Sequence, residues 1–339
     1  MYQLEQEKIK ETINGKNILI TGGTGSFGNK IVDTLLNNFS PNKIVVFSRD
    51  EFKQSKMQEI YSCEKYKNIR YFIGDVRDYD RLLLAFKNID IVFHAAALKQ
   101  VPALEYNPME AVKTNIIGTD NVIRASIYNK VKKVIAISTD KCVEPVNLYG
   151  ATKLCLEKMV IAANNIAEST NFSVLRYGNV FGSRGSVVEI FHKQKQNKLL
   201  KVTDEKMTRF TITLQDAINF VLNCTTRMIG GEIFVPKLPS YNILQLAKVI
   251  SPESKIEITG MRAGEKLHEL MIGKYETSQT IDCDNFYVII PSITYRSDDL
   301  SKIYTKNCSL IEYSSENNNV ISEEELNKLY IEFIKSYKE

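Results

Sequence analysis

The sequence predicts an α/β protein with a doubly wound parallel sheet and a smaller mixed α/β lobe. Three observations lead to this fold class. Short β-rich runs alternate with helix-length segments through the first half of the chain. The runs are apolar on both faces, as parallel strands covered by helices on two sides are. A glycine-rich turn joins the first run to the first helical segment.

The predicted strands are short and rich in β-branched or aromatic residues, and helical segments separate them. The strands are Lys16–Thr21, Lys43–Phe47, Ile69–Ile73, Asp90–His94, Lys133–Ser138 and Phe172–Arg176. The helices are Asn29–Asn38, Phe52–Cys63, Arg81–Phe86, Pro108–Asn129 and Leu148–Ala167. This alternation favours right-handed crossovers between parallel strands.

The regular alternation ends after about residue 179. A helix at Ile212–Arg227 and a strand at Glu232–Val235 indicate that the chain returns to the sheet. A final helix is predicted at 322–337, because Ser322 and Glu325 form a capping-box pattern. We therefore expect a dinucleotide-binding domain of residues 1–179 plus about 211–236, and a substrate lobe of about 180–210 plus 237–339.

Composition excludes several classes of protein. The chain has 339 residues, with 44 Lys and Arg against 40 Asp and Glu, and the formal charge of +4 does not indicate a nucleic-acid partner. No apolar run approaches the roughly 20 residues that span a bilayer, and the start has no apolar signal core, so no membrane association is expected. Six scattered cysteines and three scattered histidines indicate free thiols in the cytoplasm and no metal site.

The glycine-rich turn has glycines at positions 22, 25 and 28, after a strand and before a helix. This context is typical of a Rossmann-like dinucleotide site, because glycine allows close backbone approach and helix-start amides bind a pyrophosphate. The alternative is a plain tight turn between strand and helix. The predicted cofactor contacts in the turn are Gly22, Thr24, Gly25, Ser26, Phe27 and Gly28.

The end of the second strand selects between NAD and NADP. Ser48, Arg49 and Lys53 offer a hydroxyl and two cations to a 2′-phosphate, whereas Asp50 would suit the ribose hydroxyls of NAD. We predict NADP, although these charges could also form an ordinary solvated turn. Asp75 follows the third strand and is predicted to accept from the adenine amino group, to cap the next helix, or both.

A reactive cluster is predicted at the carboxyl end of the fifth strand. Tyr149 and Lys153 share one helix face, and a neighbouring ammonium would lower the pKa of the phenol so that it could take a proton. The preceding strand ends in Thr139, Asp140 and Lys141. The alternative for this trio is a surface turn with an ordinary ion pair.

Together the motifs TGGTGSFG, SRDEFKQS, GDVRD, HAAALKQVP, STDK and YGATK resemble the extended short-chain dehydrogenase/reductase family. RYGNVFGSRGSVV, MTRF and MRAGEKLHE extend the match, which covers roughly residues 15–320. The set is most similar to the configuration-inverting UDP-N-acetylglucosamine 4,6-dehydratases, which begin pseudaminic acid and related pathways. Membrane-anchored, retaining relatives typically carry Met at the position of Tyr149, so the tyrosine favours the inverting branch.

The resemblance implies a mechanism for the reactive cluster. Tyr149, helped by Lys153, takes the proton of the sugar 4-hydroxyl, and hydride passes to NADP, which each turnover regenerates. Lys141 removes the C5 proton, for which its pKa must be lowered. Asp140 protonates the departing 6-hydroxyl, hydride returns to C6, and C5 is reprotonated on the opposite face. A 4-epimerase would need only the tyrosine, the lysine and a hydroxyl such as that of Thr139.

The resemblance also implies binding residues and assembly. The substrate contacts are Lys99, Asn179, Arg184, Arg209, Arg262 and Glu265, and further cofactor contacts are Val76, Ala95, Lys99 and Val180. His94 is expected to pack near the cofactor and not to act as a base. Helices 108–129 and 148–167 resemble a four-helix interface, so we expect a homo-oligomer, a dimer or a hexamer.

Two classes of alternative stay open at this point. A UDP-sugar 4-epimerase, or a dehydratase that retains C5, would use much of the same site. A non-catalytic regulator that senses NADP would typically lack the Tyr–Lys pair, which this chain keeps.

Overall fold

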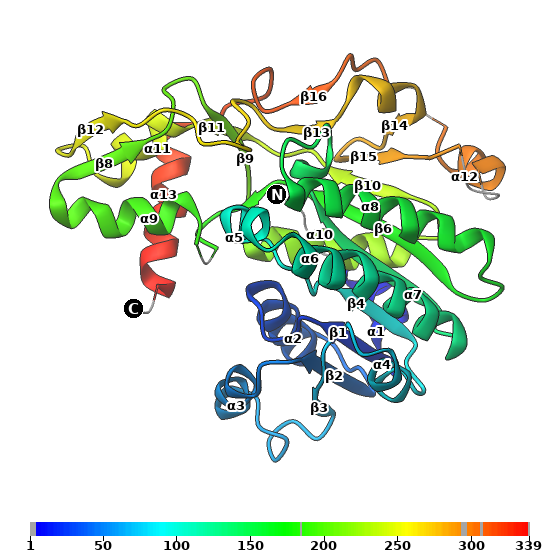
Figure 1. Cartoon of the computed structure of the whole chain (residues 1–339). Coiled ribbons are helices and arrows are strands. Elements are labelled where there is room, and N and C mark those ends of the chain that lie inside the picture. The colour runs from blue at the N-terminus through cyan, green and yellow to red at the C-terminus, as the bar shows by residue number, and fades with distance from the viewer. Residues whose placement is uncertain (1–4, 184, 293–296, 306–307, 338–339) are drawn as a thin grey trace.

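The computed structural model describes residues 5–183, 185–292, 297–305 and 308–337. Its centre is a nine-stranded sheet in the order β14-β15-β10-β6-β5-β4-β1-β2-β3, shown in Figure 1. Seven strands are parallel: β1 (Asn17–Thr21), β2 (Lys43–Ser48), β3 (Ile69–Ile73), β4 (Ile91–His94), β5 (Lys133–Thr139), β6 (Asn171–Tyr177) and β10 (Ile233–Pro236). The order 3-2-1-4-5-6 confirms the doubly wound fold.

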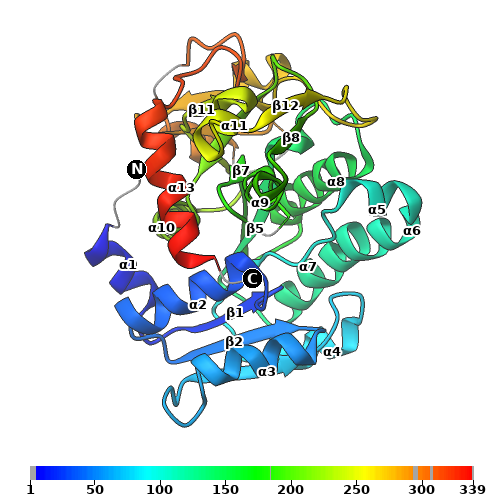
Figure 2. The same ribbon diagram turned by 90° about the vertical axis from the view of Figure 1, so that its left-hand side faces the viewer.

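Helices connect these strands and pack in two groups. Along the chain they are α1 (Gln6–Ile13), α2 (Ser26–Asn38), α3 (Glu51–Ile60), α4 (Tyr79–Ala85), α5 (Val101–Tyr106), α6 (Pro108–Ala111), α7 (Gly118–Tyr128), α8 (Leu148–Ala162) and α10 (Leu214–Arg227). Helix α10 contacts both α1 and α2, and α7 contacts both α4 and α8. Figure 2 shows the two groups on either side of the sheet.

The long helix predicted at 108–129 is interrupted. Between α6 and α7 the segment Val112–Ile117 is π-helical, a local geometry often found at functional sites. Asn115 in this segment donates to the Leu98 carbonyl at 2.9 Å and accepts from the Leu98 amide at 2.8 Å. The irregular turn therefore holds the loop that follows β4 in place.

The second half adds two strands to the main sheet and builds a smaller lobe. Strand β15 (Phe286–Ile289) pairs antiparallel with β10, and β14 (Thr280–Asp282) pairs with β15. The remaining elements are β7 (Asn179–Val180), α9 (Val187–Gln194), β8 (Leu199–Val202), β9 (Thr208–Ile212), β11 (Ser240–Asn242), α11 (Ile243–Ile250), β12 (Lys255–Ile258), β13 (Leu270–Ile272), α12 (Ser297–Ile303), β16 (Tyr313–Ser314) and α13 (Glu323–Ser336). The capping box of Ser322 and Glu325 at α13 is confirmed.

Buried apolar side chains form two clusters. The larger one follows the main sheet and its helices. The smaller one joins α9, β8, α11 and α13 through residues such as Phe191, Leu200, Leu246 and Leu326. The division into the two predicted domains stays a prediction, and β14 and β15, assigned to the substrate lobe, extend the large sheet.

Candidate active site

A cavity of about 650 Å³ runs along the carboxyl ends of the parallel strands. This is the edge at which doubly wound folds bind their ligands. The predicted cofactor residues that line it are Gly22, Thr24, Gly25, Ser26, Phe27, Ser48, Arg49, Asp50, Lys53, Asp75, Val76, Ala95, Lys99, Tyr149, Lys153 and Val180. Thr139, Lys141 and Asn179 line the same cavity, so it joins the glycine turn to the reactive cluster.

The glycine turn is packed too closely for side chains. A Cβ on Gly28 would lie 2.3 Å from the Gly23 carbonyl oxygen, and one on Gly22 would lie 2.9 Å from the Ala96 backbone. Gly22 also has a φ of +66°, which favours glycine. Ser26 and Phe27, at the start of α2, line the cavity, and the start of a helix is a place that suits a pyrophosphate.

Two cations, Arg49 and Lys53, and the carboxylate of Asp50 lie at the end of β2, and the carboxylate already has hydrogen-bond and ion-pair partners. Asp50 caps α3, accepting from the Lys53 amide at 2.9 Å, and its carboxylate pairs with the Lys53 ammonium at 2.9 Å. These bonds hold the pKa of Asp50 below its ordinary value. Ser48 bonds the Thr24 hydroxyl at 2.8 Å, and the half-exposed Arg49 lies at the rim.

Asp75 is held by arginines. Burial raises the pKa of its carboxyl, but hydrogen bonds from Arg77 and the charge of Arg49 outweigh burial and lower it. The alternative that Asp75 caps the next helix is wrong, because Asp78 caps α4 by accepting from the Arg81 amide at 2.9 Å. The carboxylate of Asp75 still faces the cavity.

Buried hydroxyls on the cavity wall, among them those of Thr114 and Ser186, are left without a protein partner. Among the described residues, neither Thr114 Oγ1 nor Ser186 Oγ has a hydrogen-bond partner, and both residues line the cavity. Buried polar groups are normally hydrogen-bonded. These groups, the closely packed glycines and the two cations at the end of β2 fit a bound dinucleotide.

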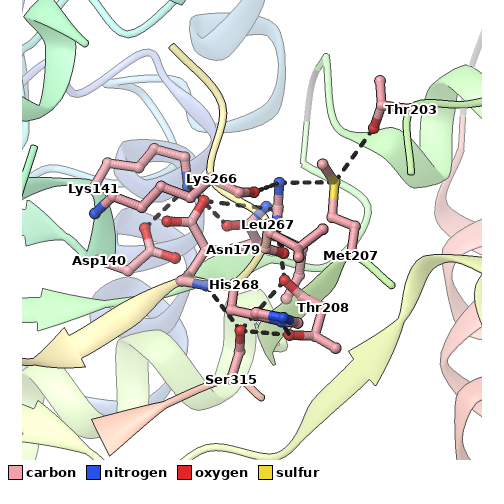
Figure 3. Close-up of polar contacts among 12 residues, drawn as sticks. Asp140, Lys141, Asn179, Thr203, Met207, Thr208, Lys266, Leu267, His268 and Ser315 are labelled. Atoms are coloured by element: carbon pink, nitrogen blue, oxygen red, sulfur yellow. Dashed lines mark hydrogen bonds and ion pairs between the residues drawn. The ribbon is translucent and has the colours of Figure 1, made fainter. Parts of the chain in front are cut away.

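The short 3₁₀ turn Asp140–Cys142 follows β5 and is called the reactive turn below. It places Lys141 between three oxygen atoms. Its Nζ lies 3.0 Å from Asp140 Oδ1, 3.1 Å from Asn179 Oδ1 and 3.3 Å from Glu269 Oε1. Figure 3 shows Asp140, Lys141 and Asn179 converging at this point. Thr139 donates from its hydroxyl to Asp140 at 2.8 Å. Thr139, Asp140 and Lys141 thus form a connected cluster.

The pKa of Lys141 is shifted in the direction opposite to the expected one, whereas that of Asp140 is shifted as expected. Burial lowers the pKa of Lys141, but the carboxylates of Asp140 and Glu269 outweigh it, so the pKa lies above its ordinary value and not below it. Burial also raises the pKa of Asp140, as an acid requires. The two carboxylates therefore favour the ammonium form of Lys141.

Tyr149 and Lys153 both reach the cavity from α8, but they do not form the simple pair that the sequence suggests. Burial raises the pKa of Tyr149 to about 12, and Lys141 is the cation that opposes this increase most strongly. Lys153 donates to the Ile137 carbonyl at 2.7 Å, and burial lowers its pKa to about 8. The pKa of Tyr149 is therefore raised and not lowered as expected, and Lys153 is not among the main groups that shift it.

Gly150 brings helix α8 against the reactive turn. A Cβ on this residue would lie 2.0 Å from the Lys141 carbonyl oxygen. Asn147 caps the helix by accepting from the Gly150 amide at 2.8 Å. The glycine of the Tyr-Gly pair therefore allows the backbone of Lys141 to pack directly on the helix that carries Tyr149.

A second cavity of about 220 Å³ adjoins the first at Lys141 and Asn179. Four of the six predicted substrate residues line it: Asn179, Arg209, Arg262 and Glu265. Lys99 lines the larger cavity instead. The predicted contact of Arg184 lies outside the described residues.

Arg209 helps to build the wall of this second cavity. Its guanidinium donates to the carbonyls of Thr208, Lys266 and Leu267 at 2.7, 3.0 and 3.1 Å. These bonds fix the segment that leads to Glu269, around the labelled residues in Figure 3. Arg209 thus has a scaffolding role that the sequence analysis did not predict.

His94 is fully buried between two threonines. Its Nδ1 lies 2.8 Å from Thr21 Oγ1 and its Nε2 lies 3.1 Å from Thr119 Oγ1. Burial lowers the pKa of His94 to about 3, so it is neutral and cannot exchange protons with a ligand near neutral pH. That His94 packs near the cofactor stays a prediction, and its neighbour Ala95 lines the large cavity.

The sequence analysis missed two buried carboxylates. Glu269 was within a motif already noted, MRAGEKLHE, but its contact with Lys141 depends on the tertiary fold. Glu157 pairs with the buried Arg176 at 2.6 Å and accepts from Cys142 at 3.0 Å, behind the reactive turn. No spacing in the sequence indicates either contact.

Within the described ranges, no group of three or more His, Cys, Asp or Glu side chains could hold a metal ion. None of the helices there is long and apolar enough to cross a membrane.

The fold and the site together define an extended short-chain dehydrogenase/reductase. The family model described as "Polysaccharide biosynthesis protein" matches residues 18–291. A UDP-N-acetylglucosamine 4,6-dehydratase (inverting) of Campylobacter jejuni is 56% identical over 284 residues, covering 83% of this chain and 84% of that protein. The chain therefore belongs to the polysaccharide biosynthesis protein family that includes the inverting UDP-N-acetylglucosamine 4,6-dehydratases.

Two further comparisons extend over more of the chain. A UDP-glucose 4-epimerase of Rickettsia bellii is 43% identical over 330 residues, covering 93% of this chain and 95% of that protein. The X-ray structure of Pen from Bacillus thuringiensis superposes with a TM-score of 0.86 at 40% identity, covering 94% of this chain and 98% of that one.

Proposed function

We propose that this protein is a UDP-N-acetylglucosamine 4,6-dehydratase that inverts C5. The product would be UDP-2-acetamido-2,6-dideoxy-β-L-arabino-hex-4-ulose. The observation that carries this proposal is the contact of Lys141 with Asp140, 3.0 Å apart at the junction of the two cavities. The 56% identity to an inverting dehydratase supports the same reaction.

The cofactor in this proposal is NADP. Asp50 caps α3 and pairs with Lys53, whereas the half-exposed Arg49 at the same rim offers a guanidinium to a 2′-phosphate, with the Lys53 ammonium as a second cation nearby. Gly22, Gly25 and the first turn of α2 would hold the pyrophosphate. When bound, NADP would accept the hydride from C4 and return it to C6, and a proton added to C5 on the opposite face would complete the inverted product.

Tyr149 would take the proton of the sugar 4-hydroxyl. Because burial raises its pKa to about 12, the phenol must first lose its proton, and added positive charge in the cavity would favour this. Lys153 has a lowered pKa of about 8, and it can carry either charge state near neutral pH. It would position the phenolate and contribute part of that charge.

Asp140 and Lys141 would supply the acid and the base of the elimination together. Transfer of one proton from Lys141 Nζ to Asp140 Oδ1, over their 3.0 Å hydrogen bond, gives a neutral amine and a carboxylic acid. The amine then takes the proton from C5, and the acid protonates the 6-hydroxyl as it leaves as water. The step restores the original ammonium and carboxylate.

The sugar nucleotide would lie across the second cavity. Arg262 offers a guanidinium for the diphosphate, and Arg209, Asn179, Glu265 and Lys99 would complete the contacts. We also propose a cytoplasmic homo-oligomer that feeds a pseudaminic acid or related glycan pathway. Light scattering of the purified protein tests its assembly.

A UDP-sugar 4-epimerase is the second candidate. The 43% identity to a protein named UDP-glucose 4-epimerase over 330 residues favours it. An epimerase leaves the mass of the sugar nucleotide unchanged, whereas a dehydratase lowers it by one water. Mass spectrometry of UDP-N-acetylglucosamine after incubation with the protein therefore separates the two, and an unchanged mass would reject the dehydratase.

A further inference from the structure

Glu269 is a buried carboxylate that the elimination described above does not use. Its residue is 3% exposed, and it follows the MRAGEK segment on the wall of the second cavity. Its backbone is fixed on both sides, because its amide donates to Ser315 Oγ and its carbonyl accepts from the Ser315 amide, both at 2.9 Å. The side chain is therefore placed by a rigid main chain.

The ammonium of Lys141 has three protons, and three oxygens surround it. Asp140, Asn179 and Glu269 each contribute one oxygen, at 3.0, 3.1 and 3.3 Å. The amide oxygen of Asn179 cannot accept a proton at ordinary pH, so only the two carboxylates can. Lys141 thus has two possible proton acceptors.

Each of these two carboxylates has a second oxygen atom that does not contact Lys141. Among the described residues, Asp140 Oδ2 and Glu269 Oε2 are buried without a hydrogen-bond partner. A buried carboxylate without full hydrogen bonding is costly unless a nearby cation offsets it. Lys141 contacts both groups, and the Arg209 guanidinium lies 3.7 Å from Glu269.

We propose that Glu269 is the second carboxylate partner of Lys141, a positioning residue that holds the amine at the junction of the cavities and keeps a proton available to the Asp140–Lys141 pair. The role of Glu269 in proton transfer rests on the proposed function. The ion pair itself can be tested without turnover.

The charges around Lys141 give the direction of the effect. Glu269 raises the pKa of both Lys141 and Asp140, and Arg209 opposes it at Lys141. Other ionisable groups that interact with this cluster are Tyr149, Tyr241 and Lys266. Replacing Glu269 by Gln removes one negative charge and keeps the shape, so both pKa values should fall.

The experiment compares wild type with Glu269→Gln and a charge-matched control, Glu257→Gln, at an exposed position on β12 outside both cavities. Competitive acetylation across a pH series, read by mass spectrometry of the Lys141 peptide, gives the titration midpoint of that amine. We expect the midpoint to fall by about 1–3 pH units in Glu269→Gln and to stay at the wild-type value in Glu257→Gln. An unchanged midpoint in Glu269→Gln would overturn the proposal.

The pH profile of kcat/KM provides the second measurement. Both limbs should move toward lower pH in Glu269→Gln, whereas a merely structural role would lower the profile without moving it. If that variant does not fold, Glu269→Met, which is also neutral and of similar length, takes its place, and a wild-type midpoint and profile there would also reject the proposal. A shifted midpoint in a protein that does not dehydrate the substrate would retain the role of Glu269 and reject the proposed function.

Discussion

Replacement of Gly150 by Ala tests how closely the reactive turn depends on the helix behind it. Alanine is ordinarily favoured over glycine within a helix by about 0.5–1 kcal/mol. Here the new Cβ would lie 2.0 Å from the Lys141 carbonyl oxygen. An ordinary contact between such atoms is roughly 3.5 Å. The Cβ and the oxygen would therefore be more than about 1 Å too close, and the turn or the helix must move.

The expected cost follows from that displacement. Overpacking of this kind destabilises a fold by about 1–3 kcal/mol, which reverses the usual sign of a Gly→Ala change in a helix. A shift of about 1 Å in a catalytic group can lower the rate roughly 100-fold. Binding of the dinucleotide at the distant glycine turn should change little, because that contact involves other residues.

The assay measures kcat for the dehydration of UDP-N-acetylglucosamine, the dissociation constant for NADP and the free energy of unfolding in urea. Cys155→Ala is the matched control, because Cys155 is exposed on the same helix. The reasoning is refuted if Gly150→Ala retains kcat within about threefold of wild type, well short of the roughly 100-fold loss, and is as stable or more stable.

Three other predictions concern proton transfer, stability and cofactor choice. Lys141→Met should stop deuterium exchange at C5 and lower turnover by about 10²–10⁴-fold while NADP and UDP still bind; full activity would remove Lys141 as the base. His94 is neutral in the fold with a pKa of about 3, so the unfolded chain binds more protons below pH 6.5 and stability falls as pH drops, by about 2 kcal/mol between pH 6.5 and 5. Urea unfolding of His94→Gln should lack this part of the pH dependence, and parallel curves for the two proteins would contradict the assignment. Arg49→Ala should weaken NADP binding roughly 10–100-fold without changing NAD binding, as measured by calorimetry, and an equal loss for both dinucleotides would argue against a 2′-phosphate contact.

Local sequence patterns were sufficient to predict the parallel strands of the main sheet and the glycine turn. The strands β1, β2 and β4 have continuous apolar centres. The connection from β1 through α2 to β2 begins and ends with strong turn residues. The π-helical segment was not predicted, because residues 112–117 have an ordinary helical composition. Strands β14 and β15 were not predicted either, since each has four residues or fewer and they form by pairing beside β10.

The chemistry of the site was harder to predict than its residues. Lys141 and Tyr149 were found from spacing, but their pKa directions depend on burial and on Glu269, which is 128 positions from Lys141 and 3.3 Å away in space. The same holds for Gly150, whose contact with the Lys141 carbonyl oxygen only the fold reveals. Sequence patterns predict which groups converge, and the tertiary structure determines their charge states.

The central claim is that the cluster of Tyr149, Asp140 and Lys141 removes water and inverts C5. Proton NMR of the purified protein with UDP-N-acetylglucosamine and NADP in D₂O, without added reductant, tests it most directly. We predict a new C6 methyl signal, deuterium at C5 and couplings of the L-arabino configuration. A galacto-configured product that keeps its C6 hydroxymethyl group, or a methyl product with D-xylo couplings, would contradict the claim.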